Sequence, residues 1–154
     1  MSAEERLAAA GYSLPVPAAP LGAYVPAVQA GSFVYTSGQL PTESGSLPDR
    51  YVGKVGAAVS PQTAREAATR CAINALAAVK ALVGDLERVE RVVKVVGFVA
   101  SAPEFSAQPD VVNGASELLQ TAFGESGRHA RSAVGVASLP RDGCVEVELI
   151  VQLR

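Results

Sequence analysis

Apolar residues recur at helical spacing in the stretch that follows Ser60 and Pro61. Serine is a favoured N-cap and proline fits the first turn of a helix, so this pair marks where a helix begins. Gly84 follows the last apolar position and marks its end. The pattern predicts a long helix with one buried face, whose apolar positions are Ala64, Ala67, Ala68, Cys71, Ala75, Leu76, Val79 and Leu82.

Two further stretches have helical features. One helix is predicted to begin between Phe105 and Asp110 and to run to Gly124, with its larger apolar residues on one side. A short leading helix, Ala3 to Ala10, is predicted after Ser2, which is suited to be its N-cap. A proline-rich connector then extends to residue 20.

Five stretches have the patterning of β-strands, and several are separated by glycine or proline turns. They are residues 23–29, 33–37, 89–100, 131–137 and 144–153. The stretch from Thr42 to Val59 has no sustained period, so we predict a loop with a short strand near Tyr51 to Val55.

Without the leading helix, the order of elements is ββαβαββ. Two amphipathic helices and one mixed sheet predict an α+β fold, a two-layer sandwich with both helices on one face of the sheet. The 154 residues are expected to form one domain, in which residues 1–20 are the leading helix and connector. The other sheet face is partly apolar, and symmetric self-association is the expected way to cover it.

Composition narrows the possible partners. Charged residues make up only 18% of the chain, against about 25% in an average soluble domain. The net charge is −2 and the basic residues are scattered, so we expect no nucleic-acid partner. We also expect no membrane span, no metal site, and two reduced cysteines, Cys71 and Cys144, in a cytoplasmic protein.

Arg131 and Glu146 are the leading candidates for chemistry. Arg131 opens an apolar strand without an acidic neighbour in sequence, and a guanidinium can grip a carboxylate or phosphate at two points. Glu146 lies on one face of the last strand together with Glu148, opposite the apolar residues. The alternatives are an ordinary solvated arginine and ordinary solvated carboxylates on an open sheet face.

Three other polar residues stand beside apolar strand or helix positions. Tyr24, Ser37 and Asn113 could present hydroxyl or amide groups to a small ligand, or they could be turn and capping residues. The lone histidine, His129, is interpreted as a structural loop residue that packs at a subunit boundary. One imidazole without a nucleophile elbow makes a serine hydrolase improbable.

Several of these segments together resemble the RidA/YjgF family, over almost the whole chain from about Pro20 to Leu153. The segments are Gly22-Ala23-Tyr24-Val25-Pro26-Ala27-Val28, Val34-Tyr35-Thr36-Ser37-Gly38-Gln39-Leu40-Pro41, Ala130-Arg131-Ser132-Ala133-Val134, Leu139-Pro140 and Val145-Glu146-Val147-Glu148. The resemblance implies a chorismate-mutase-like fold, assembled as a homotrimer with clefts between subunits. It also implies hydrolysis of small reactive 2-imino acids to 2-keto acids and ammonia, without a cofactor.

The resemblance assigns roles to individual residues. Arg131 would pair with the substrate carboxylate, and Glu146 would help to position the hydrolytic water. The positions of Tyr24 and Ser37 line the same pocket, together with the backbone at Ala133. Asn113 is a further substrate-binding candidate.

The chain also departs from the family pattern. Ala133 stands where many members have cysteine. The leading helix is an addition, the Thr42 to Val59 segment is longer than usual, and the Phe105 to Gly127 region is modified. These departures indicate a divergent branch, whose substrate selectivity we expect in that loop. The alternative function is a non-catalytic protein of the same fold that binds or senses a keto acid. A ribonuclease is disfavoured by the scattered charge and the single histidine.

Overall fold

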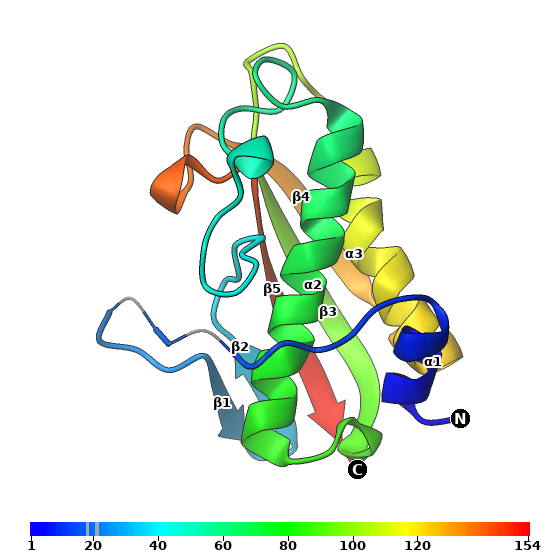
Figure 1. The fold of residues 1–154 in the computed structure, drawn as a ribbon. Helices are drawn as coiled ribbons and strands as arrows, with labels where there is room; N and C mark the ends of the chain where they lie inside the picture. The colour runs from blue at the N-terminus through cyan, green and yellow to red at the C-terminus, as the bar shows by residue number, and fades with distance from the viewer. Residues whose placement is uncertain (18, 21) are drawn as a thin grey trace.

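The computed structural model describes residues 1–17, 19–20 and 22–154. A five-stranded mixed sheet forms one layer, in the order β1-β2-β5-β3-β4 (Figure 1). Its strands are β1 (Ala27–Ala30), β2 (Phe33–Thr36), β3 (Val89–Ala100), β4 (Ala130–Val136) and β5 (Val145–Leu153). Only β3 and β4 are parallel, and the other neighbours are antiparallel.

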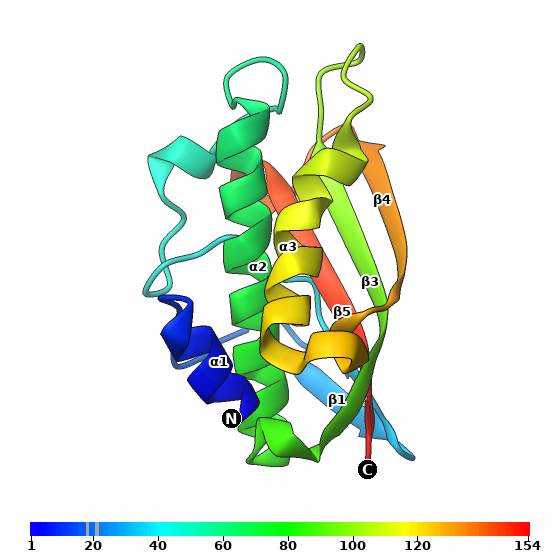
Figure 2. The same cartoon turned by 90° about the vertical axis from the view of Figure 1, so that its right-hand side faces the viewer.

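The second layer is two long helices side by side on one face of the sheet, α2 (Pro61–Val83) and α3 (Gln108–Phe123) (Figure 2). The short helix α1 (Ala3–Ala9) packs beside them. This confirms the predicted α+β sandwich with its ββαβαββ order after a leading helix. Part of the expected connector, at residue 18, lies outside the described residues.

The two predicted helix starts with serine caps are confirmed by hydrogen bonds. The Ser60 hydroxyl accepts from the Thr63 backbone N–H at 3.1 Å, and Pro61 is the first residue of α2. Ser2 caps α1 and forms a reciprocal capping box with Glu5. Each cap satisfies donors that the first helical turn leaves unpaired.

A β-bulge in β3 adjusts which side chains reach the core. Val92 pairs with Val151, whereas Lys94 pairs with Ile150, so β3 carries one residue more than β5 at this point. The bulge lets Val92 and Val95, three residues apart, both be fully buried. Strict alternation along the strand would have turned one of them away from the helices.

The two long helices approach closely at Gly114. A Cβ at this position would overlap the backbone carbonyl oxygen of Arg65 on α2. We therefore expect Gly114→Ala to lower the free energy of unfolding by about 1–3 kcal/mol, because helix backbones must separate. Urea denaturation measures this. Gly135→Ala is the matched control, since its Cβ would meet side-chain atoms and not backbone, namely Gln108 Nε2 at 2.7 Å and Ser101 Oγ at 3.4 Å. An equal loss in both variants would contradict close helix packing as the cause.

The sheet face opposite the helices carries apolar side chains that one chain leaves uncovered. Val28 is 53% exposed, Tyr35 is 41% exposed and Val134 is 43% exposed. The register places Phe98 beside Val134 on this same face. The open face expected from the sequence is therefore present in the structure.

Two strand predictions differ from the structure. The first strand covers only Ala27–Ala30, because residues 22–24 form bends before Pro26. The segment near Tyr51 to Val55 forms a 3₁₀ turn at Asp49–Tyr51 and single β-bridges at Val52 and Val55, so the predicted short strand there is wrong. The bridges are isolated because Gly53 between them adopts a left-handed φ of 115°, which breaks an extended run.

Candidate functional site

Arg131 lies on the edge strand β4 and its side chain is on the helix side of the sheet. The register pairs Arg131 with Val95, and Val95 with Leu149, both of which are buried under the helices. Paired residues share a face of the sheet. The half-buried guanidinium therefore lies against α3, where its Nη1 atom donates to Asn113 Oδ1 at 2.7 Å and to Ser116 Oγ at 3.2 Å.

Helix geometry brings these two acceptors together. Asn113 and Ser116 are three residues apart on α3 and so project from the same side of the helix. Ser116 is buried and also bonds His129, at 2.9 Å between Oγ and Nε2. The other imidazole nitrogen, Nδ1, is 2.6 Å from the Gly127 carbonyl oxygen. We call Arg131, Asn113, Ser116 and His129 the arginine cluster.

The arginine cluster carries a single positive charge near neutral pH. Burial lowers the pKa of His129, and the charge of Arg131 lowers it further, against the opposing effect of the Gly127 hydrogen bond. The imidazole is therefore neutral at neutral pH. Among the residues the structure describes, no carboxylate forms an ion pair with Arg131. A half-buried cation with neutral neighbours is suited to bind an anion.

Glu146 lies on the opposite face of the sheet from Arg131. On β5 it pairs with Phe98, and the buried residues Val145 and Val147 on either side face the helices. Burial raises the pKa of the Glu146 carboxyl, and the nearby charge of Glu148 raises it further. The carboxylate packs on Gly38, where a Cβ would overlap it. Gly38 thus leaves the space that Glu146 occupies.

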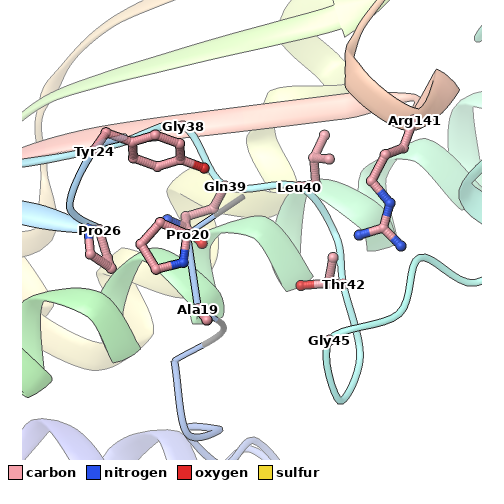
Figure 3. A pocket seen from close by; sticks show the side chains of 10 residues that line it. All are labelled: Ala19, Pro20, Tyr24, Pro26, Gly38, Gln39, Leu40, Thr42, Gly45 and Arg141. Atoms are coloured by element: carbon pink, nitrogen blue, oxygen red, sulfur yellow. The ribbon is translucent and has the colours of Figure 1, made fainter. Parts of the chain in front are cut away.

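Tyr24 borders a pocket at the end of the sheet where β2 runs into the following loop (Figure 3). The pocket wall is formed by Ala19, Pro20, Tyr24, Pro26, Gly38, Gln39, Leu40, Thr42, Gly45 and Arg141. We call it the Tyr24 pocket. Through Gly38 it adjoins Glu146, and through Thr42 and Gly45 it includes the loop in which selectivity was expected.

Ser37 has a structural partner in the chain. Its hydroxyl donates to the Val25 carbonyl oxygen at 2.7 Å, and its backbone N–H donates to that of Pro26. These bonds tie the segment that carries Tyr24 to the end of β2. Ser37 therefore supports the pocket wall without belonging to the set of residues that line it.

The candidate residues form two groups that one chain keeps apart. Arg131, Asn113 and Ala133 belong to β4 and α3, at one edge of the sheet. Tyr24 and Ser37 flank β1 and β2 at the other edge, and β5 and β3 lie between. Since Arg131 and Glu146 also face opposite sides of the sheet, a site that contains both needs a second copy of the chain.

Sequence reasoning missed Ser116 as a site neighbour and gave His129 only a packing role. The signal for Ser116 was its spacing of three residues from Asn113 on a predicted helix. Arg141, on the wall of the Tyr24 pocket, was missed because it stands in a turn and adopts a left-handed φ of 59° that no pattern indicated.

Three further features of the described part of the chain concern a metal site, reactive cysteines and a membrane-spanning helix. Within residues 1–17, 19–20 and 22–154, no three His, Cys, Asp or Glu side chains gather as a metal site. Cys71 and Cys144 are buried free thiols, and burial raises the pKa of Cys144 to about 12, so it stays a protonated thiol. No helix in the same ranges is long and apolar enough to cross a membrane.

Comparison with known proteins gives one consistent family. The family described as "YjgF/chorismate mutase-like, putative endoribonuclease" matches residues 4–153. Protein TCP17 of Trypanosoma cruzi is 44% identical over 93% of this chain and 89% of its own length. A 2-iminobutanoate/2-iminopropanoate deaminase of Salmonella typhimurium is 36% identical over 88% of this chain and 91% of its own.

A crystal structure of an Agrobacterium tumefaciens protein of unknown function is similar to this fold. It is 50% identical, with a TM-score of 0.91 over 99% of this chain and 92% of that one. The match to the family covers nearly all of the sequence, and the architecture agrees with it. The chain belongs to the YjgF/RidA family.

Proposed function

We propose that this protein hydrolyses small 2-imino acids to 2-keto acids and ammonia. The observation that carries the proposal is the guanidinium of Arg131, which is half-buried, held by two neutral hydrogen-bond acceptors and left without a carboxylate partner among the described residues. Such a cation favours a small carboxylate. Two relatives named as 2-iminobutanoate/2-iminopropanoate deaminases support this choice of carboxylate.

The reaction needs few groups because the imine carbon is already electrophilic. Water adds to the C=N carbon and one of its protons goes to the nitrogen, which gives a carbinolamine. The new hydroxyl then loses its proton as the C–N bond breaks, and the nitrogen leaves with both protons as ammonia while the keto group forms. Orientation of substrate and water supplies a large part of such a rate increase. We assign to Glu146 the role of orienting the water and accepting its proton. Its raised pKa supports this role, because a general base works best when its pKa is close to the working pH.

The complete site is proposed to form between two copies of the chain. The β4 edge of one copy, with Arg131, Asn113 and the backbone at Ala133, would face the Tyr24 pocket and Glu146 of its neighbour. The exposed apolar residues on the open sheet face, such as Val134, would be covered in the same contact. A homotrimer gives three such clefts, each with residues from two subunits.

Selectivity among imino acids is proposed to come from the Tyr24 pocket. Thr42 and Gly45 bring the long loop to its wall, and Arg141 stands on the same wall. Ala133 on β4 offers a methyl group and backbone where a reactive thiol is common in the family. These differences leave the carboxylate-binding arginine unchanged while altering what surrounds the rest of the substrate.

Direct measurement of imine decay tests the proposal. An amino-acid oxidase produces 2-iminopropanoate or 2-iminobutanoate in the cuvette, and the loss of imine is followed with and without the protein. Faster decay at catalytic protein concentration supports the proposal. Decay at the buffer rate with folded, oligomeric protein overturns it, and binding of 2-ketobutyrate without turnover would then indicate the sensor alternative.

Gly38→Ala gives a prediction specific to Glu146. The added methyl group would overlap the carboxylate, so Glu146 must rotate away and kcat should fall by about 10-fold or more. The carboxylate tip is flexible, so the melting temperature should change little. In the Glu146→Gln background the same glycine substitution should cost much less, and equal losses in both backgrounds would contradict this coupling.

A further inference from the structure

The hydrogen bonds of the arginine cluster have a direction that can be worked out from their acceptors. The Gly127 carbonyl can only accept, so His129 Nδ1 must carry the proton that it receives at 2.6 Å. In the neutral imidazole, Nε2 is then an acceptor, and the Ser116 hydroxyl donates to it at 2.9 Å. The oxygen of Ser116 is left to accept from Arg131.

This arrangement uses one end of the guanidinium and leaves the other free. The Nη1 atom has two N–H donors, and its two partners are Asn113 Oδ1 and Ser116 Oγ. No hydrogen bond from Nε or Nη2 of Arg131 occurs among the described residues. These two atoms form the edge of the guanidinium whose parallel N–H groups match both oxygens of a carboxylate.

We infer that Ser116 and His129 are positioning residues of the anion site, which hold Arg131 so that its Nε–Nη2 edge receives the carboxylate of the substrate. The inference deepens the proposed function and rests on it for the identity of the ligand. His129 acts through Ser116: by accepting the hydrogen bond of the hydroxyl, it keeps a lone pair of the serine oxygen directed toward Nη1. Without that acceptor, the buried hydroxyl is free to rotate, and Arg131 keeps only Asn113 as a fixed partner.

Two amide substitutions at position 129 separate this role from simple packing. Glutamine can place an oxygen near the position of Nε2, so His129→Gln retains an acceptor for Ser116 and loses the donor to Gly127. Asparagine can place an N–H near the position of Nδ1, so His129→Asn retains the donor to Gly127 and loses the acceptor. Both substitutions remove the imidazole ring. A third variant, Ser116→Ala, removes the hydroxyl that links His129 to Arg131, and alanine is well suited to a position inside a helix.

The test measures the dissociation constant of 2-ketobutyrate by calorimetry, beside KM and kcat for the imine. We expect His129→Asn and Ser116→Ala to weaken binding by about 10-fold and to raise KM similarly, the effect of one misdirected hydrogen bond to a charged group. His129→Gln should stay within about threefold of the unsubstituted protein. Equal loss in the asparagine and glutamine variants, or no loss in Ser116→Ala, overturns the inference.

The binding measurement also distinguishes this inference from the proposed function. Unsubstituted protein that binds the keto acid without turnover refutes the hydrolase, while the same order of affinities among the variants would still support the positioning role. Thermal unfolding of each variant shows whether it is folded. We expect the two position-129 variants to show similar changes in melting temperature but different affinities for 2-ketobutyrate.

Discussion

Arg131→Ala should lower kcat/KM for 2-iminopropanoate by about 100- to 1000-fold, equivalent to about 3–4 kcal/mol. The substrate carboxylate would lose its two-point partner, and the acceptors Asn113 and Ser116 would lose the donor that they share. Arg131→Lys keeps the charge but not the planar fork, so it should recover only part of the activity. Initial rates of imine loss measure both effects.

Arg128→Ala is the control for the loss of a positive charge nearby. Arg128 is three residues before Arg131, and its exposed side chain forms an ion pair with Glu125 at 3.5 Å. Its removal should leave kcat/KM within about twofold, because exposed ion pairs contribute little. If Arg131→Ala stays assembled and retains full activity, the carboxylate-binding role of Arg131 is wrong.

Glu146→Gln should lower kcat by about 100-fold or more, because the amide cannot accept the proton of the attacking water. The KM should change much less, since Arg131 would still hold the carboxylate. Glu148→Gln is the matched control: it removes a carboxylate from the same strand and the same face. Equal loss of kcat in the two variants would show that kcat depends on the negative charge of this sheet face and not on the position of the Glu146 carboxylate.

The same substitution has a second effect, on stability, with a defined pH dependence. Burial raises the pKa of Glu146 above its ordinary value of 4.5, so the folded state holds this proton more tightly than the unfolded state. The stability that the protonated carboxyl contributes is therefore complete below pH 4.5 and is lost as the pH rises through the folded-state pKa. Glutamine removes that loss.

Glu146→Gln should therefore raise the melting temperature at about pH 8 more than at about pH 4, while it lowers activity. Differential scanning calorimetry at both pH values measures the two shifts. A larger stabilisation in acid would mean that the ionised carboxylate has favourable partners in the folded state, which would contradict desolvation as the cause of its raised pKa.

The sequence predicted the order and type of the main elements because their signals are local. Ser60, Pro61 and Gly84 mark the ends of α2 as expected, and the β-branched run of β3 was recognised over its full length. The segment near Tyr51 was wrongly predicted to be a short strand. Its sequence does not show that Gly53 adopts a left-handed conformation between two isolated β-bridges.

The relation between the two candidate residues could not be predicted from sequence. Whether Arg131 and Glu146 share a sheet face depends on how β4 and β5 each align with β3, and the register that sets this involves residues far apart in the chain. The arginine cluster could not be predicted from the sequence for a similar reason. Ser116 occupies a buried position of α3 and meets His129 only after the chain has turned back toward β4.

A subunit-mixing experiment shows whether the active site is shared between two copies of the chain. Arg131→Ala and Glu146→Gln proteins, each almost inactive, are unfolded, mixed in equal amounts and refolded together, and mass spectrometry verifies that mixed oligomers form. In a ring with random assortment, about a quarter of the clefts would join an intact Arg131 to an intact Glu146 of a neighbour. A shared site should therefore restore about a quarter of the normal activity. Mixed oligomers that stay as inactive as either variant alone would show that Arg131 and Glu146 of neighbouring copies do not form one site.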